Sequence, residues 1–214
     1  MSRKIQAFVT GRWKENCYVV SDEQANAVVI DPGDDFATIG AYLRESGFRL
    51  LAILNTHGHY DHVGAVAPLR AAFGAPFHLH QKDLTLLRHT NLYRKLFDGD
   101  RSIEVPEVDR FCDEIDTPLT FGGLQFRVLH TPGHTPGGLS FVSGPDVFTG
   151  DTLFRGAVGR IDLPGGNARD LCTSLHKLSR LDPELAIHPG HGRASTIGAE
   201  LKDNAAFRKA LECG

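Results

Sequence analysis

The sequence has few cysteines, and none of them form a close pair. Cys17, Cys112, Cys172 and Cys213 are widely spaced along the 214 residues, and no Cys-x-x-Cys motif occurs. This spacing excludes the dense disulfide framework that stabilises small secreted domains. We therefore expect a protein of the reducing cytoplasm.

Concentrated positive charge is also missing. The net charge is -3, and basic residues are scattered apart from a modest group at Arg88, Arg94 and Lys95. Nucleic-acid binders present a basic surface, so we expect no nucleic-acid partner. No apolar run approaches the roughly 20 residues that span a bilayer, and no apolar segment of a signal peptide follows the N-terminus, so we expect no membrane association.

Apolar residues are sufficient for a proper core and are distributed without a low-complexity linker. They make up 41% of the chain, which predicts a single domain over residues 1–214. Short apolar runs predict strands at residues 5–9, 17–20, 27–30, 50–54, 77–80, 124–129, 138–142, 146–148, 152–154 and 185–187. Helical spacing predicts helices from residue 34 or 35 to 47, at 62–73 and 82–88, after Asn167, and at 197–211, whereas 91–116 is expected to be irregular. The interleaving of strands and helices indicates an α/β fold.

Histidine is concentrated where the predicted strand 50–54 ends. His57, His59, Asp61 and His62 form the pattern His-x-His-x-Asp-His. In an extended loop, residues i and i+2 point the same way, so His57 and His59 can bind one metal. Asp61 and His62 are expected where the loop has turned into the next helix, facing a second metal. A single histidine here would be read as a loop residue, but four such groups predict a zinc, iron or manganese site.

Three further motifs place ligand types directly after predicted strands. Pro-Gly precedes His134 and His191, and Gly150 precedes Asp151. Each motif is common by itself, because glycine-rich turns follow many strands. Together with the first cluster they supply seven ligands, which is enough for two metals that share one carboxylate.

These motifs, with Thr56-His57-Gly58-His59-Tyr60-Asp61-His62 in the lead, resemble the metallo-β-lactamase fold superfamily over nearly the whole chain. The resemblance implies a four-layer αββα sandwich with the metals at one edge between the sheets. It also implies one metal held by His57, His59 and His134, a second held by Asp61, His62 and His191, and Asp151 bridging them.

Within the superfamily, the sequence is most similar to glyoxalase II and its shorter bacterial relatives. Gly150-Asp-Thr-Leu-Phe154, Gly159-Arg160-Ile-Asp162 and Pro189-Gly-His-Gly192 carry this likeness. It implies a hydrolase of small-molecule acyl thioesters, such as S-lactoylglutathione, with two zinc ions as the expected cofactors and iron or manganese as alternatives.

One departure concerns the recognition of glutathione. Full-length glyoxalase II has a C-terminal helical domain that supplies basic residues, and we expect a short form that lacks it, because little sequence follows His191. Arg160 falls where the family places a cationic glutathione contact, which predicts a substrate-binding role. A salt bridge with Asp162 is an equally good interpretation.

The expected mechanism uses a hydroxide that bridges the two metals, since bound metals bring the pKa of water near neutrality. Asp61 would orient it as the catalytic carboxylate, and a thiolate leaving group needs no strong protein acid. Asp31 and Thr135 are expected to fix ligand imidazoles by hydrogen bonds, with a turn residue and a loop hydroxyl as the simpler interpretations.

Other polar residues receive smaller roles. His130 and His188 are expected to support the loops, and His78, His80, His89 and His176 receive none. The segment 84–100 suits a solvated helix with an apolar underside better than the rim of a substrate pocket.

Two alternative functions use the same residues. A persulfide dioxygenase would hold a single iron through His57, His134 and Asp151, and it shares the Gly-Arg-x-Asp element. A lactonase or a biosynthetic hydrolase acting on a carrier-bound acyl group is the third possibility, because a fold does not determine its substrate.

Overall fold

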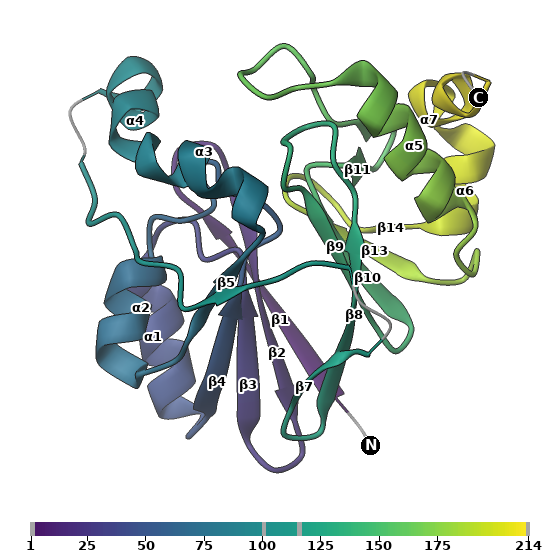
Figure 1. Ribbon diagram of the computed structural model, residues 1–214. Helices are drawn as coiled ribbons and strands as arrows, with labels where there is room; N and C mark the ends of the chain where they lie inside the picture. The colour runs from purple at the N-terminus through teal and green to yellow at the C-terminus, as the bar shows by residue number, and fades with distance from the viewer. Residues whose placement is uncertain (1–2, 100–101, 115–116, 213–214) are drawn as a thin grey trace.

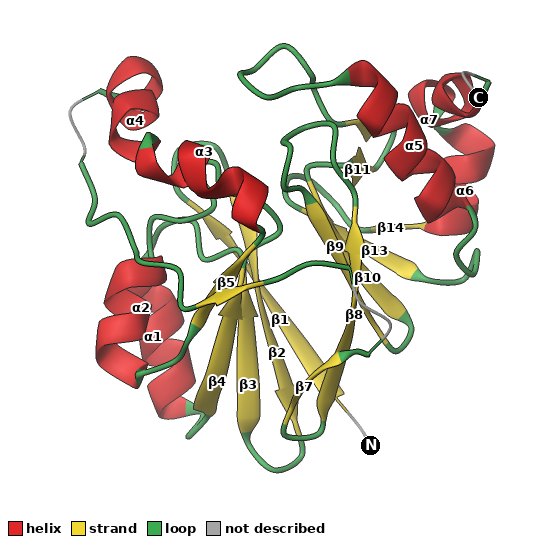
Figure 2. Ribbon diagram, in the orientation of Figure 1, coloured by secondary structure: helices red, strands yellow, loops and turns green. Residues whose placement is uncertain are grey.

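Two six-stranded β-sheets pack face to face, and helices cover both outer faces (Figures 1 and 2). The computed structural model describes residues 3–99, 102–114 and 117–212. The expected four-layer αββα sandwich is confirmed, and the loops at one end of both sheets carry the candidate ligands (Figure 1).

The first half of the chain forms one sheet with the strand order β1-β2-β3-β4-β5-β6. Its strands are β1 (Arg3–Thr10), β2 (Glu15–Asp22), β3 (Asn26–Ile30), β4 (Arg49–Leu54), β5 (Phe77–Leu79) and β6 (Arg110–Phe111). Its helices are α1 (Phe36–Glu45), α2 (Val66–Phe73), a 3-10 turn (Gln81–Asp83), α3 (Leu84–Arg88) and α4 (Thr90–Asp98). Strands β3 to β6 run parallel, so their carboxyl ends meet at one edge of the sheet.

The second half forms a sheet with the order β14-β13-β10-β9-β8-β7, and a short pair β11-β12 stands apart. The strands are β7 (Leu119–Phe121), β8 (Leu124–His130), β9 (Leu139–Ser143), β10 (Asp146–Gly150), β11 (Leu153–Phe154), β12 (Ala157–Val158), β13 (Ala186–Pro189) and β14 (Ser195–Thr196). The helices are α5 (Ala168–Ser179), α6 (Ile197–Asp203) and α7 (Ala205–Leu211), and they cover the outer face (Figure 2).

Three separate apolar layers hold these four layers together. The layer between α1, α2 and the first sheet includes Leu43 and Leu69, and the layer between the sheets includes Phe126 and Phe141. The layer beneath α5 to α7 includes Leu175. A sheet covered on both faces buries every residue of its inner strands, and for that reason such strands appear as unbroken apolar runs.

Strand β3 illustrates how the sequence produces this arrangement. Ala27 and Val29 lie in the outer layer, while Val28 and Ile30 lie between the sheets. Successive side chains of a strand point to opposite faces, so a run of apolar residues fills two layers at once.

Helix α2 begins later than the sequence predicts. The expected helix 62–73 starts at Val66, so Pro68 lies in its first turn, where a missing N–H costs nothing. Asp61 and His62 therefore precede the helix, and the expectation that they belong to it is wrong. They lie in a turn closed by the bond from the His62 amide to the His59 carbonyl (3.0 Å).

The segment 91–116, which we expected to be irregular, is partly ordered into regular structure. Most of helix α4 falls within it, as does strand β6. The remaining expectation for residues 100, 101, 115 and 116 lies outside the described residues. The helix forms because residues 90–98 contain neither glycine nor proline, and Gly99 follows directly.

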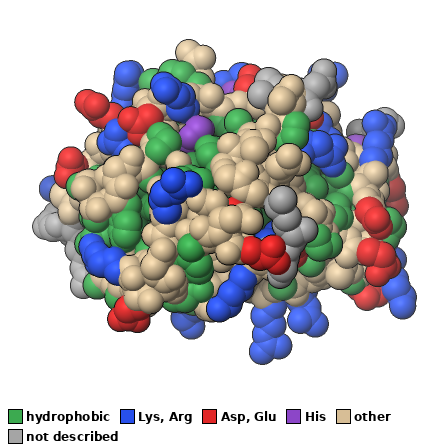
Figure 3. Space-filling view, turned by 90° about the horizontal axis from the view of Figure 1, so that it is seen from below, with side chains coloured by type: hydrophobic (Ala, Val, Ile, Leu, Met, Phe, Trp, Pro, Cys, Tyr) green, Lys and Arg blue, Asp and Glu red, His purple; other side chains and the backbone are tan. Residues whose placement is uncertain are grey.

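Two surface features bear on partners. In the part of the chain that the structure describes, no helix has both the length and the apolar character needed to cross a bilayer. On the face opposite the ligand-bearing loops, basic side chains are interspersed with acidic and apolar ones and form no continuous patch (Figure 3).

The inter-sheet layer gives a direct test of the fold. Replacing the fully buried Phe126 with alanine is expected to reduce the free energy of unfolding by about 3–5 kcal/mol, because it leaves a cavity between the sheets. Urea denaturation measures the change. Phe111→Ala is the control, since Phe111 is 56% exposed and its loss should change stability by under about 1 kcal/mol. Equal effects of the two substitutions would contradict this packing.

Candidate metal centre

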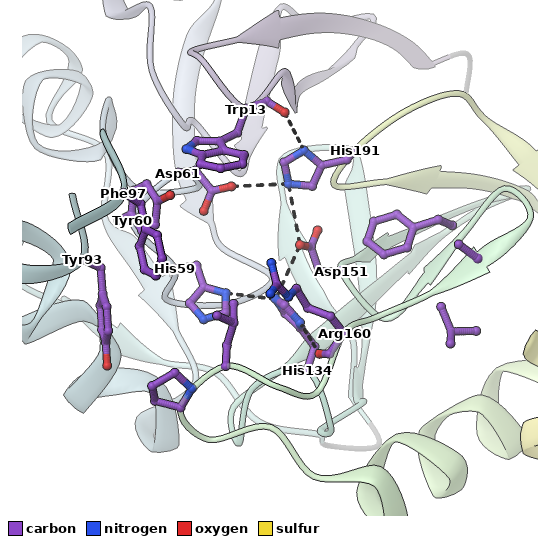
Figure 4. Close-up of a pocket in the computed structure, with 15 residues that line it drawn as sticks. Trp13, His59, Tyr60, Asp61, Tyr93, Phe97, His134, Asp151, Arg160 and His191 are labelled. Atoms are coloured by element: carbon purple, nitrogen blue, oxygen red, sulfur yellow. Dashed lines mark hydrogen bonds and ion pairs between the residues drawn. The ribbon is translucent and has the colours of Figure 1, made fainter. Parts of the chain in front are cut away.

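All seven candidate ligands lie on four loops that meet at one end of the sandwich. The first four follow β4, and the others follow β8, β10 and β13. Figure 4 shows His59, Asp61, His134, Asp151 and His191 pointing toward one another at the base of a pocket. The structure therefore brings together every residue that the motifs singled out as a ligand.

The first group consists of His57, His59 and His134, whose candidate ligand atoms all lie within 4.8 Å of one another. His134 Nε2 and His59 Nδ1 are 2.9 Å apart. All three side chains are buried. A single metal ion can be placed among three such nitrogens, as in sites with three histidine ligands.

The second group consists of Asp61, His62 and His191. Asp61 Oδ2 lies 3.4 Å from His191 Nε2 and 3.9 Å from His62 Nε2. Asp151 lies between the two groups, because its Oδ2 is 3.5 Å from His134 Nε2 and 3.6 Å from His191 Nε2. Its position suits a carboxylate shared by two ions.

Buried atoms without a hydrogen-bond partner show whether the residues present fit a metal. Among the described residues, His57 Nε2, His62 Nε2 and Asp151 Oδ1 are buried and have no hydrogen-bond partner. Each such atom costs about 1–3 kcal/mol when it is left unsatisfied. The three belong to both groups and to the carboxylate between them, so the residues present fit two divalent ions.

The two groups differ in charge. Burial lowers the pKa of His57 and brings that of His59 to about 3, so both imidazoles are neutral, as metal coordination requires. Burial also acts to lower the pKa of His62, but the carboxylates of Asp151 and Asp61 outweigh it and raise that pKa. Two carboxylates therefore act on the second group, and they would also attract a metal cation bound there.

Asp31 links the imidazoles of both groups, as expected. Its Oδ2 accepts a bond from the Thr56 hydroxyl (2.6 Å) and lies 3.1 Å from His62 Nδ1. The same hydroxyl lies 3.0 Å from His57 Nδ1. Asp31 adopts a left-handed backbone conformation with φ of 49°. Few residues other than glycine adopt it, although aspartate and asparagine do so more readily than most, and here the hydrogen bonds of the Asp31 side chain stabilise it.

Thr135 departs from the expectation that it fixes an imidazole. Its hydroxyl donates to Asp83 Oδ2 (2.8 Å), and the same carboxylate accepts the amides of Gly58 (2.9 Å) and Gly137 (2.6 Å). Asp83 is fully buried, and burial raises its pKa. It ties the loop that follows β4 to the loop that follows β8, a role that its place near the start of a short helix does not reveal in the sequence.

Two ligand imidazoles are oriented by backbone carbonyls that the sequence could not identify. His134 Nδ1 lies 2.8 Å from the Arg160 carbonyl, and His191 Nδ1 lies 3.1 Å from the Trp13 carbonyl. Carbonyl partners of this kind select the tautomer that presents the other nitrogen to a metal.

Other histidines have supporting contacts. His130 Nε2 lies 3.0 Å from the Pro136 carbonyl, and His188 Nε2 lies 2.7 Å from Asp146 Oδ1. His80, His130 and Asp113 also come within 4.8 Å of one another. The rings of His80 and His130 stack almost in parallel, however, with their centroids 4.4 Å apart. An ion therefore cannot lie in the plane of both rings.

A cavity of about 360 Å³ opens onto the candidate metal groups. Tyr93 and Phe97 from α4 line it, so the segment expected to be only a solvated helix also forms the pocket rim. Arg160 lines it too, and its guanidinium forms a two-pronged ion pair with Asp162, with both N···O distances at 2.7 Å. The expected salt bridge is therefore present.

The comparison with known proteins agrees with this geometry. A profile described as the metallo-beta-lactamase superfamily matches residues 10–191, a stretch that includes all seven candidate ligands. The chain belongs to the metallo-β-lactamase superfamily.

Individual relatives cover nearly the whole of this superfamily member. It is 36% identical over 196 residues to the hydroxyacylglutathione hydrolase GloC of Haemophilus influenzae, covering 90% of this chain and 92% of that protein. The structure of the B3 metallo-beta-lactamase BLEG-1 is similar with a TM-score of 0.88 and 34% identity, covering 94% and 98% of the two chains. That of TTHA1623 in a di-iron-bound form has a TM-score of 0.85 and 41% identity, with the same coverage. The chain is thus a metal-dependent hydrolase of the superfamily.

The contact of Asp31 with both groups can be tested without an activity assay. Asp31→Asn leaves a single acceptor oxygen to hold Thr56 and His62, so metal affinity should fall roughly 10–100-fold. Competition with a fluorescent chelator measures the affinity. Asp182→Asn, at an exposed position, is the matched control and should change nothing. An unaltered metal affinity in Asp31→Asn would contradict the role of Asp31 in positioning the imidazoles.

Proposed function

We propose that this metallo-β-lactamase superfamily member hydrolyses acyl thioesters with the help of two zinc ions. One ion is held by His57, His59 and His134, the other by Asp61, His62 and His191, with Asp151 shared. The observation that carries the proposal is the pair of three-residue groups on either side of one carboxylate, at the base of a substrate-sized cavity. Thioester specificity is supported by the likeness to GloC, which is named a hydroxyacylglutathione hydrolase.

The chemistry divides between the ions and the chain. When bound, two divalent ions activate a water molecule and polarise the carbonyl group of the substrate. Asp61 lines the cavity, and its carboxylate orients the attacking water by accepting one of its hydrogens. A thiolate leaves without help from a protein acid, because the pKa of a thiol is about 8.5. The absence of any need for a protein acid fits a site whose innermost side chains are the proposed metal ligands.

The reaction would take place in the reducing cytoplasm. Cys17, Cys112 and Cys172 are free thiols in the structure, and the first two are buried. Glutathione is the abundant small thiol of that compartment, which makes a glutathione thioester the first candidate substrate.

A second candidate function rests on one specific arrangement. His134 lies beside both other residues of this set, with 3.5 Å between its Nε2 and Asp151 Oδ2 and 5.0 Å between its ring centroid and that of His57. Two histidines and a carboxylate are the ligand set of non-haem iron oxygenases, so a single iron here would support a persulfide dioxygenase. Oxygen consumption with glutathione persulfide distinguishes this candidate from a hydrolase.

The central test is a thioester assay on metal-replete protein. Hydrolysis is expected for S-lactoylglutathione or for another member of a broad acyl-thioester panel. A chelator should abolish turnover, and added zinc should restore it. A metal-replete protein that leaves the whole panel intact would refute thioesterase function.

We propose that the Arg160 guanidinium gives up its ion pair with Asp162 and instead binds a carboxylate on the thiol part of the substrate. The exchange is feasible because exposed ion pairs contribute at most about 1 kcal/mol. Arg160→Gln should raise KM for a glutathione thioester about 5- to 20-fold, with kcat preserved. The same acyl group on N-acetylcysteamine, which has no carboxylate, should be hydrolysed as by the parent enzyme. Arg208→Gln on α7 is the control, and an unchanged KM in Arg160→Gln would assign Arg160 to the ion pair alone.

A further inference from the structure

The cavity beside the candidate ligands is lined largely by apolar side chains. Trp13, Tyr60, Tyr93 and Phe97 gather on one side of it and form an aromatic wall (Figure 4), and Phe154 and Val158 also line it. The ligand side chains of Asp61, His59 and His191 reach the same cavity. The scissile bond of a substrate that reaches the two candidate ligand groups therefore has apolar side chains directly beside it.

The aromatic wall is held in place by contacts between distant segments. Tyr60 stacks on Phe97, with ring centroids 6.1 Å apart and planes inclined by 8°. The indole N–H of Trp13 donates to Asp98 Oδ1 (2.7 Å) at the end of α4. These contacts join the turn after β1 to α4, so the wall exists before any substrate arrives.

The aromatic wall is also exposed. Trp13 is 45% and Phe97 46% accessible, although both are large apolar side chains. Apolar side chains that gather around an open cavity mark a binding site for an apolar group. Burial of these surfaces by a ligand would contribute to binding in proportion to the area covered.

Charged partners are scarce in this cavity. Among the residues of the described chain that line it, Arg160 is the sole lysine or arginine, and its guanidinium is paired with Asp162. Apart from Arg160, the described side chains of this lining offer no lysine or arginine to the carboxylates of a thiol such as glutathione, so they are unfavourable for that part of the substrate. An apolar acyl group needs no such partner.

We propose that this cavity binds the acyl group and selects large apolar acyl groups, such as hexanoyl or phenylacetyl, over short polar ones such as lactoyl. The inference rests on the proposed thioesterase function and adds the substrate class to it. Tyr60 directly precedes Asp61 and lines the same cavity, so the apolar wall begins next to the reacting carbonyl.

The test is a series of acyl groups on one thiol. Acetyl, lactoyl, butanoyl, hexanoyl and phenylacetyl thioesters of N-acetylcysteamine are compared by kcat/KM. Each buried methylene should raise kcat/KM about fourfold, so hexanoyl, with four more methylenes than acetyl, should exceed it by about 250-fold when all four are buried and by about 16-fold when two are. A flat series, or a preference for lactoyl, would overturn the inference while leaving thioesterase function intact. No turnover on any member by a protein that hydrolyses S-lactoylglutathione would overturn the inference alone, and failure on both would overturn the thioesterase function as well.

A substitution then locates the preference in the aromatic wall. Phe97→Ala should lower the ratio of hexanoyl to acetyl kcat/KM about tenfold, and Phe97→Leu should retain most of it. Phe111→Ala removes an aromatic side chain of similar exposure on β6, outside the cavity lining, and should leave the ratio unchanged. Because both substrates are hydrolysed by the same folded fraction, partial unfolding does not alter the ratio. An unaltered ratio in Phe97→Ala would contradict the assignment.

Discussion

Three buried imidazole and carboxylate atoms without a hydrogen-bond partner lie at one end of this molecule. They are His57 Nε2 in the first group, His62 Nε2 in the second and Asp151 Oδ1 on the carboxylate between the groups. Such atoms are unfavourable unless something binds them, and buried polar groups are almost always satisfied in native proteins. The sandwich can be understood as the scaffold that keeps these atoms in place despite that cost.

Close approach between loops makes the arrangement possible. A Cβ atom at Gly190 would collide with the Asp151 carboxylate and with the ring of His62, so the Pro-Gly-His motif requires glycine for the ligands to converge. The Asp83 carboxylate binds two of the ligand loops from beneath, and Asp31 binds two imidazoles through Thr56 and directly. The candidate ligands are thus held in place by a layer of hydrogen bonds within the chain.

Much of this could be predicted from the sequence, for physical reasons that differ between elements. Strands such as β3 are recognisable because burial on both faces demands an unbroken apolar run. The ligands are recognisable because local spacing and the glycine turns place them after strands. The partners that orient them are not, since Trp13 and His191 lie 178 positions apart and meet only in the folded chain. The place of helix α4 at the pocket rim is not recognisable either, because its contacts, such as that of Phe97 with Tyr60, are tertiary.

The chemistry of the centre and the selection of the substrate reside in different parts of the molecule. The candidate ligands come from loops at the strand ends, whereas Trp13, Tyr93 and Phe97 of the aromatic wall come from the turn after β1 and from α4, and only its Tyr60 belongs to a ligand loop. Loops of this kind vary independently of a scaffold, so one centre can serve many substrates.

The most direct test of the account is the anomalous scattering of zinc in crystals of the zinc-loaded protein. The account predicts two peaks about 3.5–4 Å apart, one beside His57, His59 and His134 and the other beside Asp61, His62 and His191, with Asp151 contacting both. A single peak, or a pair coordinated by other residues, would contradict it.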